Sequence, residues 1–365
     1  MKIGLSELEA LKEGAAVLGC GGGGDTHLSY LLAKQAVMEK GPVALLKVHE
    51  LDDDDLIIPT AMMGAPIIMS ERVPAGDEAL ASLRALERHL GGRAAATMPI
   101  EVGGLNVFTS LTTAALGGMP LVDADGMGRA CPELQMCTFN AYGVPCAPMT
   151  ISSEHGHMVL IQSGDNPSME RVARSVVIGM GGVGYIAAYP MTGKQAKETS
   201  VVGTVSLAVR IGRALIEARR RKAHPAGAVL DAFAQSTYGQ GMVLIEGRVL
   251  EVQRRRTGRA VKGRVVLEGS DSYTGQTGIV QFQNENLTAE LNGRVVSTVP
   301  DLIVLLHHES GSPVLIENLK VGLKVTCMIV PTPDITVTGE ALALWGPRAF
   351  GYSCDHRSCR EERWR

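Results

Sequence analysis

Three segments in the first half of the chain place a carboxylate close to glycine or proline. They span residues 62–74, 99–106 and 120–133. Glycine and proline fix the path of a loop, so a polar side chain between them can be presented rigidly to a ligand. Two carboxyl groups in different surroundings can divide the roles of general acid and general base. We therefore predict that Glu101, Asp123 and Asp125 are catalytic residues.

The two aspartates are two residues apart, so their side chains share a face if the segment is extended. Arg129 follows closely enough to pair with one aspartate and to lower the pKa of that carboxyl. For either aspartate alone, a turn or a helix cap is an equally good interpretation.

A run of glycines around one cysteine, Gly-Cys-Gly-Gly-Gly-Gly-Asp at residues 19–25, is the most unusual local sequence. Glycine costs about 1 kcal/mol relative to alanine in regular structure, so such a run is typical of backbone that turns sharply or lies against a ligand. Helical patterns precede and follow it, at residues 3–18 and 26–39. Backbone N–H groups at a helix N-terminus favour an anion or a polarised carbonyl. We predict a substrate-binding loop formed by Cys20, Gly21, Gly22, Gly23, Gly24 and Asp25.

Other interpretations of this loop remain open at this point. A nucleotide site is disfavoured, because the Walker lysine is missing and a helical pattern, not a strand, precedes the glycines. A flexible surface connection is the plain structural alternative. Cys20 could be a nucleophile with a lowered pKa, or a small packed thiol.

Composition describes an ordinary globular protein. The chain has 365 residues, 45% of them hydrophobic, and a formal net charge of −3, which leaves no basic field for nucleic acid. No apolar run approaches the roughly 20 residues that span a membrane, and the N-terminus has no secretory signal. We expect a cytoplasmic protein whose seven cysteines are free thiols.

The pattern of elements predicts two domains. Short apolar strands alternate with helices up to about residue 165, including a helix at 76–90, which indicates an α/β domain over residues 1–165. Turn residues at 163–167 mark a boundary. Residues 166–365 are predicted to begin with helices at 169–180 and 194–222, and to continue as a β-rich α+β domain, since strand patterns dominate from 242 to 344.

Three further groups have metal-ligand residue types. His155 and His157 follow Glu154, but an exposed hairpin is the favoured interpretation. His307, His308 and Glu309 form a second, weaker candidate. The tail contains Cys354, His356 and Cys359, for which a partly ordered terminus is favoured because a second cysteine pair is missing.

Nearly the whole chain resembles the S-methyl-thiohydantoin desulfurase family, which is associated with hydantoinase and oxoprolinase-type enzymes. The resemblance rests on the loop at residues 19–25, called the glycine loop below, and on Glu101 with Gly103, Gly104 and Asn106. It also rests on the blocks at residues 62–66, 123–129, 189–193, 282–287, 299–303 and 346–352. This chain departs from the family at Cys20, where threonine is expected.

The resemblance implies a fold and a reaction. The fold is an N-terminal α/β domain with a C-terminal domain related to swivelling β/β/α folds. The reaction is hydrolytic removal of methanethiol from an S-methyl-thiohydantoin, a five-membered N–C–N ring, to give a hydantoin. Asp123 or Asp125 would be the base and Glu101 a second carboxylate. The substrate contacts would come from the glycine loop, Asn106, Arg129, Asn284 and Glu285.

The resemblance leaves cofactors and partners open. We expect no organic cofactor, a divalent metal is possible, and no metal ligands are assigned. A homo-oligomer and association with a hydantoinase-type enzyme are both compatible with the family. Two alternatives stay open: a metal-dependent amidohydrolase acting on an intact hydantoin or lactam, and a non-catalytic partner subunit of a hydantoinase-type enzyme.

Overall fold

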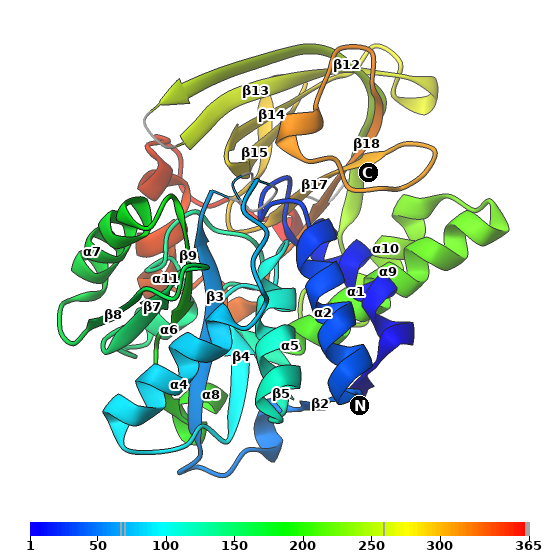
Figure 1. The fold of residues 1–365 in the computed structure, drawn as a ribbon. Coiled ribbons are helices and arrows are strands. Elements are labelled where there is room, and N and C mark those ends of the chain that lie inside the picture. Colours follow the sequence, from blue (N-terminus) through cyan, green and yellow to red (C-terminus); the bar gives the residue numbers. More distant parts are fainter. Residues whose placement is uncertain (66–67, 69–70, 258–259, 362–365) are drawn as a thin grey trace.

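The computed structural model describes residues 1–65, 68, 71–257 and 260–361. It contains two domains, a mixed α/β domain and a β-domain whose antiparallel sheet curves over it as a half-barrel (Figure 1). The predicted pairing of an α/β N-terminal region with a β-rich C-terminal region is confirmed. Pro66, part of one family block, lies outside the described residues.

The N-terminal sheet has the strand order β1-β2-β5-β4-β3-β9-β7-β8, and β10 pairs with β3. Its strands are β1 (Lys2–Ile3), β2 (Val43–Leu46), β3 (Leu56–Gly64), β4 (Ala96–Pro99), β5 (Leu121–Val122), β7 (Met149–Ser152), β8 (Met158–Ile161), β9 (Val183–Ala187) and β10 (Met191–Thr192). Strands β2, β5, β4 and β3 are parallel. Their carboxyl ends therefore lie along one edge, which is where ligands bind in open α/β sheets.

Helices cover this sheet. They are α1 (Leu5–Leu18), α2 (His27–Lys40), α4 (Glu78–Leu90), α5 (Asn106–Gly117), α6 (Thr138–Ala141) and α7 (Asn166–Gly179). The helices predicted at 3–18, 26–39, 76–90 and 169–180 correspond to α1, α2, α4 and α7. Helix α7 starts earlier than predicted because the Asp165 carboxylate accepts a hydrogen bond from the Ser168 N–H at 2.7 Å and caps the helix. No helix within the described ranges is long and apolar enough to cross a membrane.

The single long helix predicted at 194–222 is wrong. The segment forms α8 (Gly193–Thr199), strand β11 (Val201–Val202) and α9 (Thr204–Arg221). Gly203 adopts a left-handed conformation with φ of 76°, which breaks the helical path. Val201 and Val202 instead pair with strand β6 (Ala124–Asp125). This tertiary pairing overrides the local helical propensity.

After α9 the chain continues with α10 (Pro225–Ala234) and then forms an antiparallel sheet of order β16-β15-β14-β13-β12-β18-β17. The strands are β12 (Met242–Thr257), β13 (Ala260–Gly269), β14 (Thr277–Gln283), β15 (Glu285–Leu291), β16 (Arg294–Thr298), β17 (Leu302–His307) and β18 (Lys324–Val330), followed by helix α11 (Gly339–Trp345). The closer likeness to a swivelling β/β/α fold stays a prediction.

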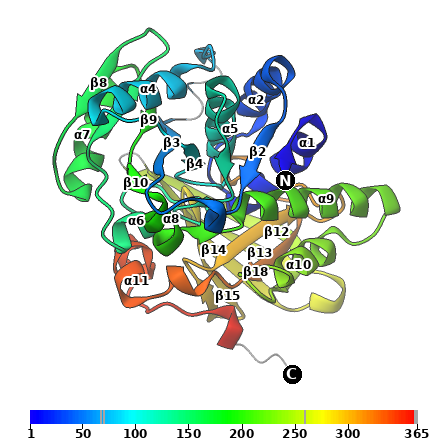
Figure 2. The same cartoon turned by 90° about the horizontal axis from the view of Figure 1, so that it is seen from below.

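Two contacts tie the later part of the chain to the N-terminal domain. Strand β9 lies between β3 and β7 in the N-terminal sheet, although it follows the predicted boundary at residue 165. Helices α1 and α9 lie side by side (Figure 2), and glycines allow their backbones to touch. A Cβ atom on Gly14 would lie 1.8 Å from the Ala208 carbonyl oxygen, and one on Gly212 would lie 1.7 Å from that of Ala10.

Candidate active site at the domain interface

The glycine loop joins α1 to α2 and lies between the two domains (Figure 1). On one side, the Leu105 N–H donates to the Gly23 carbonyl at 2.9 Å. On the other side, the Asn286 N–H donates to the Cys20 carbonyl at 2.8 Å, and the Ile316 N–H donates to the Gly21 carbonyl at 2.9 Å. The loop is therefore packed between the domains, which excludes a flexible surface connection.

Close packing explains why glycine occupies this loop. A Cβ atom on Gly22 would lie 2.5 Å from Glu285 Oε1. A Cβ on Gly23 would lie 2.6 Å from the Gly103 carbonyl oxygen. The Gly22 N–H is already bound to the Gly19 carbonyl at 2.9 Å, whereas the N–H groups of Gly23 and Gly24 have no acceptor in the described part of the chain. These two amides are donors that the loop can offer to a ligand.

Glu101 lies just beyond the carboxyl end of β4, where the parallel sheet predicts a ligand site. Its side chain is buried, and its Oε2 accepts a hydrogen bond from Asn106 Nδ2 at 2.8 Å. Asn106 Oδ1 in turn accepts from the Met62 N–H at 2.7 Å, so both ends of the amide are occupied. Asn106 therefore positions Glu101 against the end of β3.

The pKa of Glu101 is raised well above its usual range. Burial is the main cause, and the nearby carboxyls of Glu285 and Asp125 raise it further, while the Asn106 hydrogen bond opposes the shift. Glu101 thus favours the protonated form.

Glu285, at the start of β15, comes from the C-terminal domain, and its carboxyl lies near that of Glu101. We call these two carboxyls and the side chains around them the carboxyl cluster; the surrounding residues are Cys20, Arg129, Cys131 and Asn286. Glu285 is 4% exposed, and its Oε2 is buried without a hydrogen-bond partner among the described residues. Burial raises its pKa to about 8, although the positive charge of Arg129 opposes the shift. A buried polar atom without a partner is rare in folded proteins and marks a place where a ligand or water can bind.

Arg129 is 1% exposed and binds backbone carbonyls of the C-terminal domain. Its guanidinium donates to the carbonyls of Asp301 and Asn286, each at 2.8 Å. The predicted pairing with Asp123 or Asp125 is wrong, because these carbonyls take up its donors. Arg129 therefore joins the domains and places a buried positive charge beside Glu285.

Two thiols complete the cluster. Burial raises the pKa of both Cys20 and Cys131, and the charge of Arg129 only partly opposes this. Cys20 has no exposed surface. Both findings support a packed thiol at Cys20 and disfavour a thiolate nucleophile.

The two predicted catalytic aspartates hold backbone in place. Asp125 is fully buried, and its Oδ2 accepts from the N–H groups of Val102 at 2.9 Å and Gly128 at 2.9 Å. Burial raises the pKa of Asp125 to about 7 despite these hydrogen bonds. Asp123 Oδ1 accepts from the Ser206 N–H at 2.8 Å in the first turn of α9. Their catalytic roles stay predictions that compete with these structural ones.

Two predicted binding residues use their side chains elsewhere. Asp25 is exposed and its Oδ1 accepts from the His27 N–H at 2.9 Å, at the start of α2. Asn284 Oδ1 accepts from the Val261 N–H at 3.0 Å, and its φ of 63° shapes the turn between β14 and β15. The turn delivers Glu285, whereas the Asn284 side chain holds the neighbouring strand.

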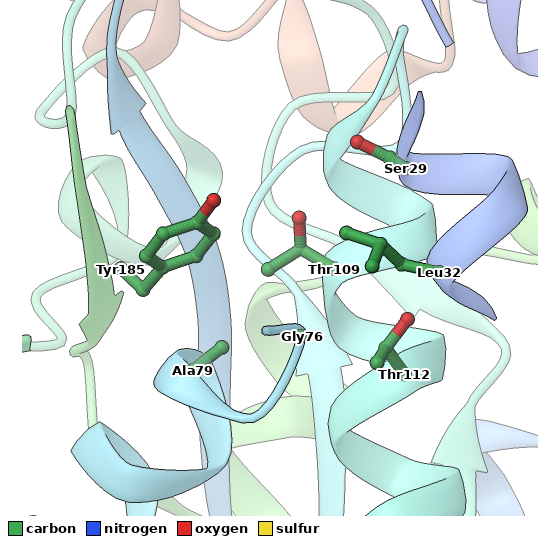
Figure 3. A pocket seen from close by; sticks show the side chains of 7 residues that line it. All are labelled: Ser29, Leu32, Gly76, Ala79, Thr109, Thr112 and Tyr185. Atoms are coloured by element: carbon green, nitrogen blue, oxygen red, sulfur yellow. The ribbon is translucent and has the colours of Figure 1, made fainter. Parts of the chain in front are cut away.

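A small cavity opens beside α5, one turn after Asn106. It has a volume of about 20 Å³ and is lined in part by Ser29, Thr109 and Tyr185. The oxygen atoms of these three side chains lie around one space (Figure 3), and the buried Ser29 Oγ has no hydrogen-bond partner among the described residues. A cavity needs about 10–15 Å³ to hold a water molecule, so this one has room for a water but not for a five-membered ring.

Sequence reasoning missed two members of the cluster, Cys131 and Asn286. The Asn286 Nδ2 donates to the Ile303 carbonyl at 3.0 Å, and its buried Oδ1 has no partner within the described ranges. Asn286 stands in the block at residues 282–287 that carries the family resemblance, which was the available signal, whereas Cys131 lies two residues after the block at 123–129.

The other candidate ligand groups have separate positions. His155 and His157 are exposed in the turn between β7 and β8, which confirms the predicted hairpin. The tail is docked, because the Cys359 N–H donates to Asp301 Oδ2 at 2.9 Å. Among the described residues, the one group whose ligand atoms converge as a metal site would require contains His308, with His224 and Glu246.

Comparison with known proteins identifies the family. The profile of the S-Me-THD-like N-terminal domain matches residues 6–163, and that of the S-Me-THD-like C-terminal domain matches residues 164–359. A crystal structure of a protein from Chromobacterium violaceum is 26% identical with a TM-score of 0.80, and covers 98% of this chain and 100% of that one. No curated protein matches the chain. Because the two profiles together cover almost all of its length, the chain belongs to the S-Me-THD-like family.

Proposed function

We propose that the protein is a hydrolase that converts an S-methyl-thiohydantoin to a hydantoin and methanethiol. The observation that carries the proposal is the pair of buried carboxyls, Glu101 and Glu285, which come from different domains. Burial raises the pKa of both, and the Glu285 carboxyl raises the pKa of Glu101 further. Their place between the glycine loop and the carboxyl end of β4 supports a ligand site. Family membership supports the substrate class.

Two nearby buried carboxyls resist being ionised together, so the pair keeps at least one proton. The reaction starts from the form with one proton, which the positive charge of Arg129 favours. In the proposed reaction, the ionised member takes a proton from water while the water oxygen bonds to the ring carbon between the nitrogens. The protonated member gives its proton to the ring nitrogen, which receives the electron pair of the C=N bond. The added hydroxyl then gives its proton to the carboxylate that protonated the ring nitrogen, and the carbonyl forms as the C–S bond breaks. The leaving methanethiolate takes the proton that the other carboxyl had accepted from water, so methanethiol is released and the pair returns to its starting form.

The groups around the carboxyl pair suit these reaction steps. The free N–H groups of Gly23 and Gly24 can hold a ring carbonyl. The Arg129 charge stabilises the ionised form of Glu285. The nearby cavity of about 20 Å³ has room for a water but not for a ring. We therefore expect the contact between the glycine loop and the β14–β15 turn to open when the substrate enters.

A thiol-release assay tests the proposal. Purified protein is incubated with a small panel of S-methyl-thiohydantoins and plain hydantoins, with and without chelator, and free thiol and ring opening are both measured. Release of methanethiol from the S-methyl compounds is the expected result. Chelator-sensitive opening of plain hydantoins without thiol release would instead establish a metal-dependent amidohydrolase. No turnover on any compound would favour the partner-subunit alternative.

The carboxyl pair is tested with Glu101→Gln and Glu285→Gln. Each substitution keeps the side-chain volume but removes proton transfer, so we expect kcat to fall about 10²- to 10⁴-fold. Glu290→Gln is the matched control, because Glu290 lies on the same strand as Glu285 and its Oε1 accepts a hydrogen bond from Gln281 at 2.9 Å. Full activity in either cluster variant, with the fold verified by circular dichroism, would overturn the assignment.

A further inference from the structure

We propose that His224, Glu246 and His308 form a divalent-metal site, for which Zn²⁺ is the favoured ion. One ligand atom from each side chain lies within 4.8 Å of the others. The inference is independent of the proposed hydrolase activity, because the group lies at the far end of β17 from Ile303, whose carbonyl binds Asn286 in the carboxyl cluster. His308 is five positions along the chain from Ile303, which corresponds to about 17 Å of extended chain.

Three different elements supply the ligands. His224 is the residue before α10, Glu246 lies on β12, and His308 follows the last residue of β17. Strand β18 aligns the two sheet residues, because Thr326 pairs with Glu246 on one side and with Leu306 on the other. His308 lies in the turn after β17, two positions beyond Leu306, and its side chain contacts Thr326.

The ligand atoms of the group lie close to the spacing that a coordinated ion requires. His224 Nε2 lies 2.8 Å from Glu246 Oε1, and the two imidazole rings are 5.8 Å apart between centroids. Ligand atoms around a tetrahedral Zn²⁺ lie about 3.3 Å apart, since each bond is about 2.0–2.1 Å long. Small side-chain rotations therefore bring all three atoms to binding distance.

Thr326 holds the two sheet ligands in place. Its Oγ1 lies 3.0 Å from His308 Nδ1 and 3.5 Å from Glu246 Oε1. A hydroxyl that contacts two ligands orients them before a metal arrives, and such supporting contacts commonly change metal affinity 10- to 100-fold.

Charge and access also favour a cation. The group contains one carboxylate and two imidazoles. Two histidines with one carboxylate form a known zinc ligand set that leaves a fourth position for water. The His224 side chain is 47% exposed, which gives an ion a path from solvent. The basic end of α9 is held elsewhere, because Arg219 Nη2 lies 2.6 Å from Glu13 Oε2, and Arg220 and Arg221 both bind Glu217.

The test is a titration of the whole protein with Zn²⁺ by calorimetry, with thermal unfolding followed in parallel. We expect one Zn²⁺ per chain and an increase in Tm with Zn²⁺, because the ion ties α10 to the sheet in the folded state only. His308→Gln and Glu246→Gln should each lower the affinity at least tenfold and remove the increase in Tm. Thr326→Val should weaken binding without abolishing it.

Two control variants separate this site from other Zn²⁺ ligands. His307→Gln changes the exposed neighbour of His308, and Cys354→Ser removes a half-buried thiol of the tail. Both should bind Zn²⁺ as the wild type does. Wild-type affinity in His308→Gln and Glu246→Gln, loss of binding in Cys354→Ser, or no binding by the wild type would each overturn the proposal.

Discussion

At the scale of single residues, Glu285 should make the stability of the protein depend on pH. Its pKa is about 8 in the folded state against an ordinary value of 4.5. Between these values the folded state holds a proton that the unfolded chain releases, so the free energy of unfolding falls as the pH rises from about 5 to 8. At about 1.4 kcal/mol per pKa unit, the loss has an upper bound of about 5 kcal/mol.

Urea unfolding between pH 5 and pH 9 measures this effect. Glu285→Gln has no proton to lose, so its unfolding free energy should decline less than that of the wild type over this range. Parallel curves for the two proteins would show that Glu285 titrates normally in the folded state.

Sequence could identify the carboxyls of the cluster but not their partners. Glu101 and Glu285 lie in blocks that carry the family resemblance, and the resemblance predicts both as site residues. The structure brings the two carboxyls together. The predicted pairing of Arg129 with an aspartate failed because its acceptors are backbone carbonyls about 170 residues away along the chain, such as that of Asp301. Every residue has a backbone carbonyl, so side-chain patterns carry no signal for which carbonyl accepts such a bond.

At the scale of elements, the crossing of α1 and α9 depends on glycine. We expect Gly212→Ala to destabilise the protein by several kcal/mol, because its Cβ would lie 1.7 Å from the Ala10 carbonyl and would force the helices apart. Gly227→Ala, in α10, has no atom within 4 Å of its Cβ and should stabilise by about 0.5–1 kcal/mol through helix propensity. Thermal unfolding of both variants measures the contrast, and equal Tm values would contradict the close packing.

Local patterns predicted the helices whose signals lie within the helix itself. Helices α1, α2, α4 and α7 have apolar positions at helical spacing, and the sequence placed each of them within a few residues. The segment from 194 to 222 failed because its break depends on Val201 and Val202 pairing with β6, about 80 residues earlier. Long-range pairing of short strands leaves little trace in a local sequence window.

At the scale of the whole molecule, the position of β9 makes the two halves interdependent. Residues 1–163 contain β3 and β7 but lack β9, which connects these two strands in the sheet. We expect a fragment of residues 1–163 to aggregate, and to become soluble when residues 164–365 are expressed with it. Size-exclusion chromatography measures both outcomes. A monomeric fragment that unfolds cooperatively by itself would contradict this interdependence.

The same strand has a consequence for synthesis on the ribosome. More than one hundred residues separate the end of β3 at Gly64 from the start of β9 at Val183. At about 5–20 residues per second, translation takes roughly 6 to 24 s to cover this interval. Throughout it, one edge of β3 presents unpaired N–H and C=O groups that can pair with another chain. Until β9 has been made, the nascent protein therefore needs a chaperone that covers the edge of β3, or a collapse slow enough that the sheet does not form before β9 is present.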